Sequence, residues 1–397
     1  ARGPFTGGRR LFRILRHGRE YSETLAGSLR KNTRFYTLFG EPGLARGGGA
    51  TIMASFVNRP GVRMEKKYHV YALGNALVDT EVEVTDEFLT RLDLSKGLMT
   101  LVDEARQQEL VAALAGEAEP HKHTCGGSAC NTVVAARHFG GQGYYACKVA
   151  DDDTGDFFVR DLRAAGVDTN MTGARENGVS GKCLVMITPD AERTMHTFLG
   201  ISQSVGEPEL DEDAIAASEF VYLEGYLVSS DSARAAAVRL RQLAEKHGVR
   251  TSLTFSDPAM VQFFRDGLAE MLGDGVDLLF CNEAEALGYT DTDSPQAALE
   301  ALKPLCRSLV MTRGAEGALV WDGEQVHHIE APPVKAIDTN GAGDMFAGAY
   351  LYALTHGHDH ATAGKLAAAA SARLVTEFGP RLPAEAHLEV RKQVLGQ

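Results

Sequence analysis

The chain lacks the features by which membrane, secreted and nucleic-acid-binding proteins are usually recognised. Its 397 residues contain no run of eighteen or more uninterrupted apolar residues, so we expect no segment that spans a membrane. Its six cysteines include no CxxC pair, which favours reduced thiols in a cytoplasmic protein, with Cys125 and Cys130 packing together only incidentally. Basic residues are outnumbered, and the formal charge of −13 argues against nucleic acid or an anionic membrane as the main partner.

What is present is the composition of an ordinary globular enzyme, preceded by a segment of a different kind. Apolar residues make up 44% of the chain and charged residues 23%, and the length allows one to three domains. Residues 1–63 hold twelve Lys or Arg and three Glu, a net charge of +9, which leaves −22 on the remainder. An Arg-rich, acid-poor leader could be an organellar transit segment. We favour an extension upstream of a natural start at Met64, and expect it to be poorly ordered.

From Lys66 onward, short apolar segments alternate with helical patterns. Strands are expected at 68–74, 143–150, 220–225, 251–256, 276–281 and 308–312. Helices are expected at 131–139, 156–165, 231–247, 259–272 and 295–306. This alternation predicts an α/β protein with a doubly wound parallel sheet.

Three further segments fall outside this alternation. Asp322-Gly323 lies between two alternating stretches within 317–329 and predicts a hairpin at the edge of the sheet. Residues 80–84 and 182–200 predict antiparallel strands of a small second sheet. We interpret that sheet as a lid, formed from about 80–100 and 180–203.

Residues 338–344, with the sequence DTNGAGD, form a turn of small residues directly before an apolar helical stretch. The first amides of a helix have no internal partners and lie at the positive end of its dipole, so they can hold a phosphate. Gly341, Ala342 and Gly343 would let the backbone approach an anion, and Asp344 could take a proton from an attacking hydroxyl. The same residues also fit an ordinary tight turn with a capping aspartate, so the motif alone leaves both interpretations open.

Two polar clusters near expected strand ends could bind hydroxyl groups. Asn75 and Asp79 follow the strand at 68–74, where they could accept hydrogen bonds from vicinal hydroxyls or form a simple Asx turn. The second cluster comprises Gly126, Gly127, Ser128 and Asn131. Its glycines would bring backbone close to a ligand, Ser128 could cap the following helix, and Asn131 would point back to the same space. A purely structural strand-to-helix turn is the alternative.

Further groups suit a nucleotide and its metal. Asn282 and Glu285 directly follow the strand at 276–281, where acid also simply favours a helix N-terminus. A second loop contributes Thr312, Gly314 and Gly317, and a small-residue helix ends at Gly379. Arg193 lies in the expected lid, where it could stabilise a transferring phosphoryl group or simply be solvated.

These motifs, in this order, resemble those of the ribokinase-like (PfkB) family of sugar and nucleoside kinases, over about residues 67–383. The Asn340 form of the turn and the GGSxxN cluster look most like the adenosine kinases of that family. No Gly-Lys-Ser/Thr follows the glycines, so the turn is not a Walker A loop. The resemblance implies a ribokinase-like fold, a mainly parallel sheet flanked by helices with a β-sheet lid, in one kinase domain at 64–397.

The resemblance also implies cofactors and roles. It implies ATP and Mg²⁺, with the catalytic groups being Asp344 as base, the amides of Gly341, Ala342 and Gly343 as an anion hole, and Arg193. The substrate-binding residues it implies are Asn75, Asp79, Gly126, Gly127, Ser128 and Asn131. Those implied for ATP are Asn282, Thr312, Gly314, Gly317, Gly341, Gly343 and Gly379, with Glu285 holding Mg²⁺ through water.

The implied reaction is transfer of the γ-phosphoryl group of ATP to the 5′-hydroxyl of adenosine, giving AMP in purine salvage. Inosine, guanosine or a free sugar such as ribose or fructose are alternative acceptors, because a diol-binding pair suits each of them. Phe198 and Met186 could contact a base, although packing within the lid is the expected role of both. A catalytically silent ligand-binding protein is the alternative from another class. We expect a monomer or homodimer.

Overall fold

The computed structural model describes residues 66–116 and 122–397. The basic segment at 1–63 lies outside the described residues. None of the helices formed by the described residues is both long and apolar enough to cross a membrane.

A nine-stranded sheet forms the centre of the fold, with the order β14-β13-β12-β11-β10-β9-β1-β5-β6. Seven strands are parallel: β1 (Tyr68–Leu73), β5 (Gly143–Ala146), β6 (Asp168–Thr169), β9 (Ser218–Glu224), β10 (Arg250–Thr254), β11 (Val276–Asn282) and β12 (Cys306–Thr312). The last two, β13 (Ala318–Trp321) and β14 (Val326–Ile329), form an antiparallel hairpin at the edge. The predictions of a parallel sheet and an edge hairpin are confirmed.

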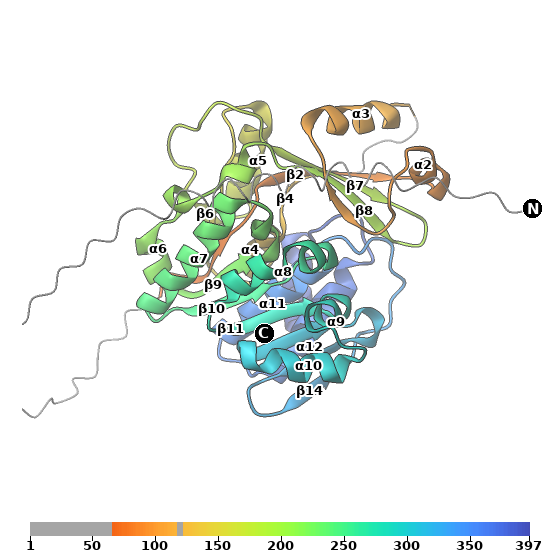
Figure 1. Ribbon diagram of the computed structural model, residues 1–397. Coiled ribbons are helices and arrows are strands. Elements are labelled where there is room, and N and C mark those ends of the chain that lie inside the picture. Colours follow the sequence, from red (N-terminus) through yellow and green to blue (C-terminus); the bar gives the residue numbers. More distant parts are fainter. Residues whose placement is uncertain (1–65, 117–121) are drawn as a thin grey trace, which may run out of the picture. The chain divides into compact units, whose positions relative to one another are not determined.

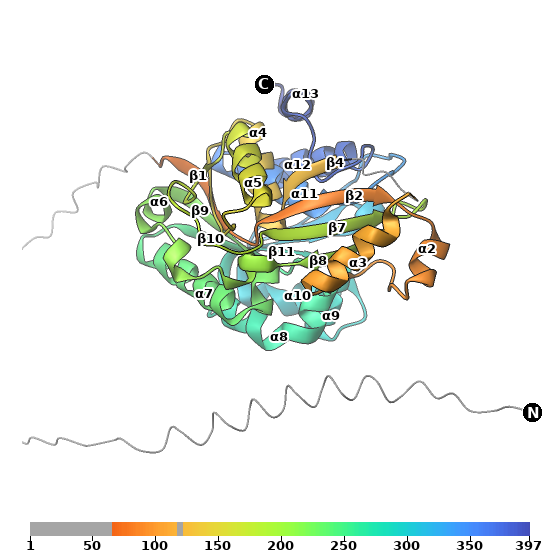
Figure 2. The same ribbon diagram turned by 90° about the horizontal axis from the view of Figure 1, so that it is seen from above.

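Helices cover both faces of this sheet, as Figure 2 shows. One face packs against α4 (Ser128–His138), α5 (Asp153–Ala164), α11 (Ala342–Thr355), α12 (His360–Leu374) and α13 (Ala384–Leu395). The other packs against α6 (Glu212–Ala216), α7 (Asp231–Lys246), α8 (Pro258–Leu272), α9 (Glu283–Thr290) and α10 (Pro295–Leu302). Each face therefore has its own apolar core, as a doubly wound sheet requires.

A second, five-stranded sheet forms the lid (Figure 1). Its order is β3 (Met99–Leu101), β8 (Arg193–Phe198), β7 (Gly181–Ile187), β2 (Leu77–Glu83) and β4 (Lys122–Gly126). Side chains alternate between its faces. One face packs on α2 (Asp86–Arg91) and α3 (Glu104–Leu114), and Met186 is buried there rather than facing a ligand.

The lid differs from the prediction in three ways. β2 pairs with β7 in parallel, and only β7 with β8 and β2 with β4 are antiparallel. The strand β4 was not predicted, because the sequence KHTCG has no sustained apolar alternation. The strand β2 also begins at Leu77, so Asp79 lies within a lid strand and not in a loop.

Several element boundaries also differ. α5 begins at Asp153, three residues early, because Asp152 caps it by accepting a hydrogen bond from the amide of Gly155. α10 ends at Leu302, because Pro304 has no N–H to donate to the carbonyl of Glu300; a 3-10 turn follows at Lys303–Leu305, and β12 begins at Cys306. These are errors of extent and leave the architecture unchanged.

Candidate active site

A cavity of about 690 Å³ lies between the lid and the carboxyl ends of the parallel strands. Most of the predicted site residues line it: Asn75, Asp79, Gly127, Ser128, Asn131, Arg193, Asn282, Glu285, Thr312, Gly314, Gly317, Gly341, Ala342, Gly343 and Asp344. Gly126 and Gly379 are not among the lining residues. The fold therefore brings together residues that are up to 269 positions apart, from Asn75 to Asp344, at the edge where doubly wound sheets bind ligands.

Asp344 lies in the first turn of α11, and each of its carboxylate oxygens has a donor. The hydroxyl of Ser128 donates to Oδ1 at 2.7 Å, and Nδ2 of Asn131 donates to Oδ2 at 3.1 Å. Burial raises the pKa of Asp344 above its ordinary value, while these two hydrogen bonds oppose the shift. The prediction that Ser128 caps α4 is wrong, because Gly127 occupies the N-cap position and Ser128 bonds Asp344 instead.

The turn before α11 contains the left-handed backbone conformation that its small residues predicted. Gly341 has a φ of +72° and forms the N-cap, and a Cβ there would lie 2.7 Å from Pro380. The amide of Ala342 already donates to the carbonyl of Thr339 at 3.3 Å. The amides of Gly343 and Asp344 lie in the first helical turn, where amides have no helical carbonyl partner, and open space surrounds Gly343. These two amides are the best-placed donors for an anion.

A buried aspartate at the start of the turn stabilises it by accepting hydrogen bonds from two backbone amides. Asp338 accepts hydrogen bonds from the amide of Asn340 at 2.8 Å and from the amide of Gly379 at 2.9 Å. Gly379 itself has a φ of +104°. Gly379 therefore helps to fix the shape of the turn. Because it does not line the cavity, it could affect a bound ligand only through Asp338.

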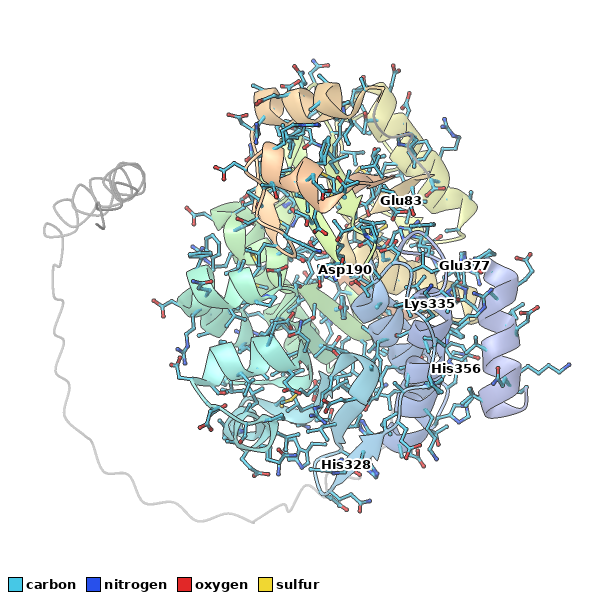
Figure 3. All side chains as sticks on the ribbon, turned by 90° about the vertical axis from the view of Figure 1, so that its right-hand side faces the viewer. Glu83, Asp190, His328, Lys335, His356 and Glu377 are labelled. Atoms are coloured by element: carbon cyan, nitrogen blue, oxygen red, sulfur yellow. The ribbon has the colours of Figure 1, made fainter. Side chains whose placement is uncertain are left out.

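The lid touches the same turn at two points. Nδ2 of Asn340 donates to Oε1 of Glu81 on β2 at 3.0 Å, and the hydroxyl of Thr339 donates to the carbonyl of Ala191 at 3.2 Å. Ala191 has a φ of +66° in the turn between β7 and β8, next to Asp190, which Figure 3 labels. The side chain of Asn340, which in the sequence only marked a kinase subtype, thus links the lid to the anion-binding turn.

Glu224, at the end of β9, bonds Asn75 and the start of α4 and was not predicted from the sequence. Its Oε1 accepts from the amide of Asn75 at 2.7 Å and from Nδ2 of Asn75 at 2.9 Å, and its Oε2 accepts from the amide of Ala129 at 2.8 Å. It is fully buried, and burial raises its pKa to about 7. The only available sequence signal was a lone acid ending the apolar strand FVYLE.

Asp79 faces the cavity from β2 and lies against Gly126 on the neighbouring strand β4. A Cβ at Gly126 would overlap the carboxyl group of Asp79, which explains why glycine is needed there although it does not line the cavity. Among the described residues, the carboxyl group of Asp79 has no hydrogen-bond partner. Burial, followed by the charge of Glu81, holds its pKa well above the ordinary value. A buried carboxyl group in this position is suited to accept hydrogen bonds from a ligand.

Arg193, the first residue of β8, brings a positive charge to the lid side of the cavity. Its Nε is buried and, within the described part of the chain, lacks a hydrogen-bond partner. Its charge lowers the pKa of both Asp344 and Glu285, so the guanidinium lies within electrostatic reach of both carboxyl groups. A cation in this position could face the phosphoryl group that is transferred.

One end of the cavity is formed by the ends of β11 and β12, where Asn282 and Thr312 are neighbours in register. Asn282 caps α9 and forms a reciprocal capping box with Glu285. Oε1 of Glu285 accepts from Nδ2 of Asn282 at 2.7 Å, and Oε2 accepts from its amide at 2.9 Å. Burial raises the pKa of Glu285 to about 7. In the next loop, Gly314 and Gly317 have φ values of +54° and +84°.

The carboxyl groups of the described residues show what kind of metal site the chain could form. Residues 66–116 and 122–397 contain no group of three or more His, Cys, Asp or Glu placed to hold a metal ion. Glu285 is one of four carboxyl residues that line the cavity, and a single such group would suffice for Mg²⁺, which keeps several waters and binds mainly through nucleotide phosphates.

Comparisons with known proteins agree with this geometry. The model of the pfkB carbohydrate kinase family matches residues 99–387. Adenosine kinase of Saccharomyces cerevisiae is 30% identical over 335 residues, which is 79% of this chain and 96% of the relative. Ribokinase of Staphylococcus aureus is 24% identical and covers 61% of this chain and 78% of the relative. The crystal structure of adenosine kinase from Sinorhizobium meliloti is 32% identical, with a TM-score of 0.78, and covers 82% of this chain and 99% of that structure.

The family match covers well over half of the chain, and the structural similarity extends over both the central sheet and the lid-bearing region. The fold, the loop at the start of α11 and the cavity under the lid are those expected of a phosphotransferase of this kind. The chain belongs to the pfkB family of carbohydrate kinases.

Proposed function

We propose that the chain is an ATP-dependent adenosine kinase that phosphorylates the 5′-hydroxyl of adenosine to AMP and serves purine salvage. The observation that carries the proposal is Asp344, a carboxylate held by Ser128 and Asn131 beside the free amides of a helix N-terminus. The adenosine kinases among the similar proteins support the choice of acceptor.

In this proposal the residues of the chain position the reactants and stabilise charge. Asp344 takes the proton of the attacking hydroxyl as its oxygen bonds to the γ-phosphorus, and the bond from that phosphorus to the β–γ bridging oxygen breaks to release ADP. The amides of Gly343 and Asp344, with Arg193, hold the equatorial oxygens of the phosphoryl group. ATP supplies that group when bound, and Mg²⁺ neutralises charge on its phosphates.

The two ends of the cavity would bind the two reactants. Asp79 and Asn75 accept hydrogen bonds from the ribose hydroxyls, while Glu224 fixes the orientation of Asn75. The loops with Thr312, Gly314 and Gly317 would lie beside the nucleotide, and Glu285 would hold Mg²⁺ through water. Residues 64–397 would then form one kinase domain with its lid.

A sugar kinase is the second candidate, because Asn75 and Asp79 suit any vicinal diol and ribokinase is among the similar proteins. The lid wall of the cavity favours a nucleoside. Its apolar lining residues are Leu77, Met99, Leu101, Met195 and Leu199. These aliphatic and thioether side chains match the flat apolar surface of a base better than a small, fully hydroxylated sugar.

The test is ADP release from ATP and Mg²⁺ with adenosine, inosine, guanosine, ribose and fructose as acceptors. We expect kcat/KM for adenosine to exceed that of each other acceptor by about tenfold or more, a difference of ~1.4 kcal/mol. A preference for ribose or fructose would identify a sugar kinase. Turnover with none of the five would favour a ligand-binding protein.

A further inference from the structure

Arg381 lies between α12 and α13, behind the wall of the cavity, and does not line it. It is 9% exposed. Its Nε donates to Oδ1 of Asn131 at 2.8 Å. Its other nitrogens lie 2.8 Å from Sγ of Cys125, 3.2 Å from Sγ of Cys130 and 3.4 Å from Oδ2 of Asp161. The two thiols that the sequence analysis expected to pack incidentally therefore surround a buried guanidinium.

The contact with Arg381 determines which way the amide of Asn131 points. A guanidinium can only donate hydrogen bonds, so the atom of Asn131 that faces it must be the carbonyl oxygen. The amide nitrogen of Asn131 then necessarily faces Asp344, where it donates to Oδ2 at 3.1 Å. Were the amide reversed, its carbonyl oxygen would face the carboxylate, and the two acceptors would repel unless Asp344 were protonated.

We propose that Arg381 is a positioning residue for the phosphoryl-transfer reaction: it fixes the amide of Asn131 so that Asn131 donates to Asp344 and keeps that carboxylate ready to accept a proton. The inference rests on the proposed role of Asp344 as base. Arg381 touches neither reactant and acts through one intervening side chain.

Other groups near Asp344 also affect its protonation, and the test must allow for them. The charge of Arg193 favours the ionised form of Asp344, as does that of Arg381. Further titratable groups interact electrostatically with Asp344: Asp79, Tyr222, Glu224 and Tyr226. Arg381 also acts electrostatically on Asp79, so the variant that keeps the positive charge, Arg381→Lys, is the one that isolates the loss of the hydrogen bond to Asn131.

The test compares Arg381→Met and Arg381→Lys with wild type, using the best acceptor from the assay above. For both variants we expect kcat to fall by about tenfold to a hundredfold, with KM for the acceptor changed by less than about threefold. The acid limb of the kcat profile should move to higher pH in the variants, because Asp344 then holds its proton more tightly. Lysine keeps the charge but lacks the Nε fork, so it should not restore the wild-type rate.

Two controls separate positioning from general stability. Arg241 is also 9% exposed, and its Nε donates to the carbonyl of Met271, away from the cavity. Arg241→Met should cost stability without moving the acid limb. In an Asn131→Ala background, Arg381→Lys, which keeps the charge, should lower kcat by less than about twofold further, because the two residues act in series.

Each possible outcome either supports or overturns the positioning role of Arg381. Full kcat and an unmoved acid limb in Arg381→Lys would overturn the proposal, as would additive losses in the double variant. Loss of acceptor binding and of melting temperature together with kcat would make Arg381 merely structural. If wild type turned over no acceptor, the proposed function would fail, whereas an active wild type with normal Arg381 variants would refute only the positioning role.

Discussion

Glu224→Gln is a nearly isosteric change at the residue that holds Asn75 and the start of α4. Both oxygens of Glu224 accept from backbone or side-chain N–H groups, and none of its side chain is exposed. With the glutamine carbonyl kept toward Asn75, its NH₂ group would face the amide of Ala129 across the present 2.8 Å contact, donor to donor. The glutamine therefore resembles the protonated acid, which also carries a donor on one oxygen.

The magnitude follows from the raised pKa of Glu224, which burial moves from 4.5 to about 7. The pKa of Glu224 is higher in the folded protein than in the unfolded one. Its contribution to the free energy of unfolding is therefore fully present below about pH 4.5 and is lost as the pH rises through about 7. At about 1.4 kcal/mol per pH unit, this loss reaches roughly 3 kcal/mol by pH 8. Glutamine cannot ionise, so the variant should gain about 2–3 kcal/mol of stability relative to wild type between pH 5 and pH 8.

The assay is urea unfolding of wild type and Glu224→Gln at pH 5, 6, 7 and 8. Glu285, whose pKa burial also raises to about 7, is common to both proteins, so its contribution cancels in the comparison. Glu219→Gln, on the same strand but paired with Arg250 near the surface, should follow the wild-type curve. A difference between wild type and Glu224→Gln that stays constant from pH 5 to pH 8 would refute the reasoning.

Glu224→Gln should also change the activity, independently of its effect on stability. At pH 8 the variant loses one hydrogen bond to a charged acceptor, worth about 1.5 kcal/mol or more, and this bond holds the substrate-binding turn. We expect KM for the nucleoside to rise about tenfold with a smaller change in kcat.

Three further predictions concern the proposed site and the extent of the domain. Asp344→Asn should lower kcat by about a hundredfold to ten-thousandfold with little change in acceptor binding, as measured by single-turnover kinetics and calorimetry. Asp79→Ala should raise KM for adenosine about a hundredfold, since its partners would be hydroxyls present in ground and transition states alike; an unchanged KM would place the diol elsewhere. A chain beginning at Met64 should keep full activity and its melting temperature, because every kinase motif follows that residue; a fall of several degrees would contradict this.

Most of the fold could be predicted because its signals are local. Buried parallel strands appear in the sequence as short apolar runs, and the helices between them have an amphipathic period. The lid was harder to predict, because its strands are half exposed and pair across long stretches of chain, such as Leu77–Glu83 with Gly181–Ile187. The direction of that pairing depends on the path of the intervening chain, which no local pattern records. The strand at Lys122–Gly126 carried no alternation at all.

The residues that line the cavity were predictable for a related reason. Glycines, amides and carboxylates at strand ends interrupt apolar patterns, and their chemistry suits hydroxyls and phosphates directly. Asp79 was singled out in this way, whereas Asp344 was noted at a helix start and Arg193 in the expected lid; the fold brings all three to one cavity. The role predicted for Ser128 was wrong. A serine at a helix start can either cap the helix or bond a distant side chain, and only the folded structure shows that Ser128 bonds a residue 216 positions away.

The charged residues that were missed share one property, which is that each is a buried charged side chain bonded to a residue of the predicted motifs. Glu224 bonds Asn75, Asp338 bonds the amide of Asn340, and Arg381 bonds Asn131. Burying a charge is costly unless it is paired with hydrogen-bonding groups, so such residues persist only where the folded structure supplies those partners. A chain could therefore keep every motif and still lose the buried contacts on which the proposed role of Asp344 as base depends. Presence of the motifs predicts the family, whereas the orientation of each site residue depends on these buried contacts.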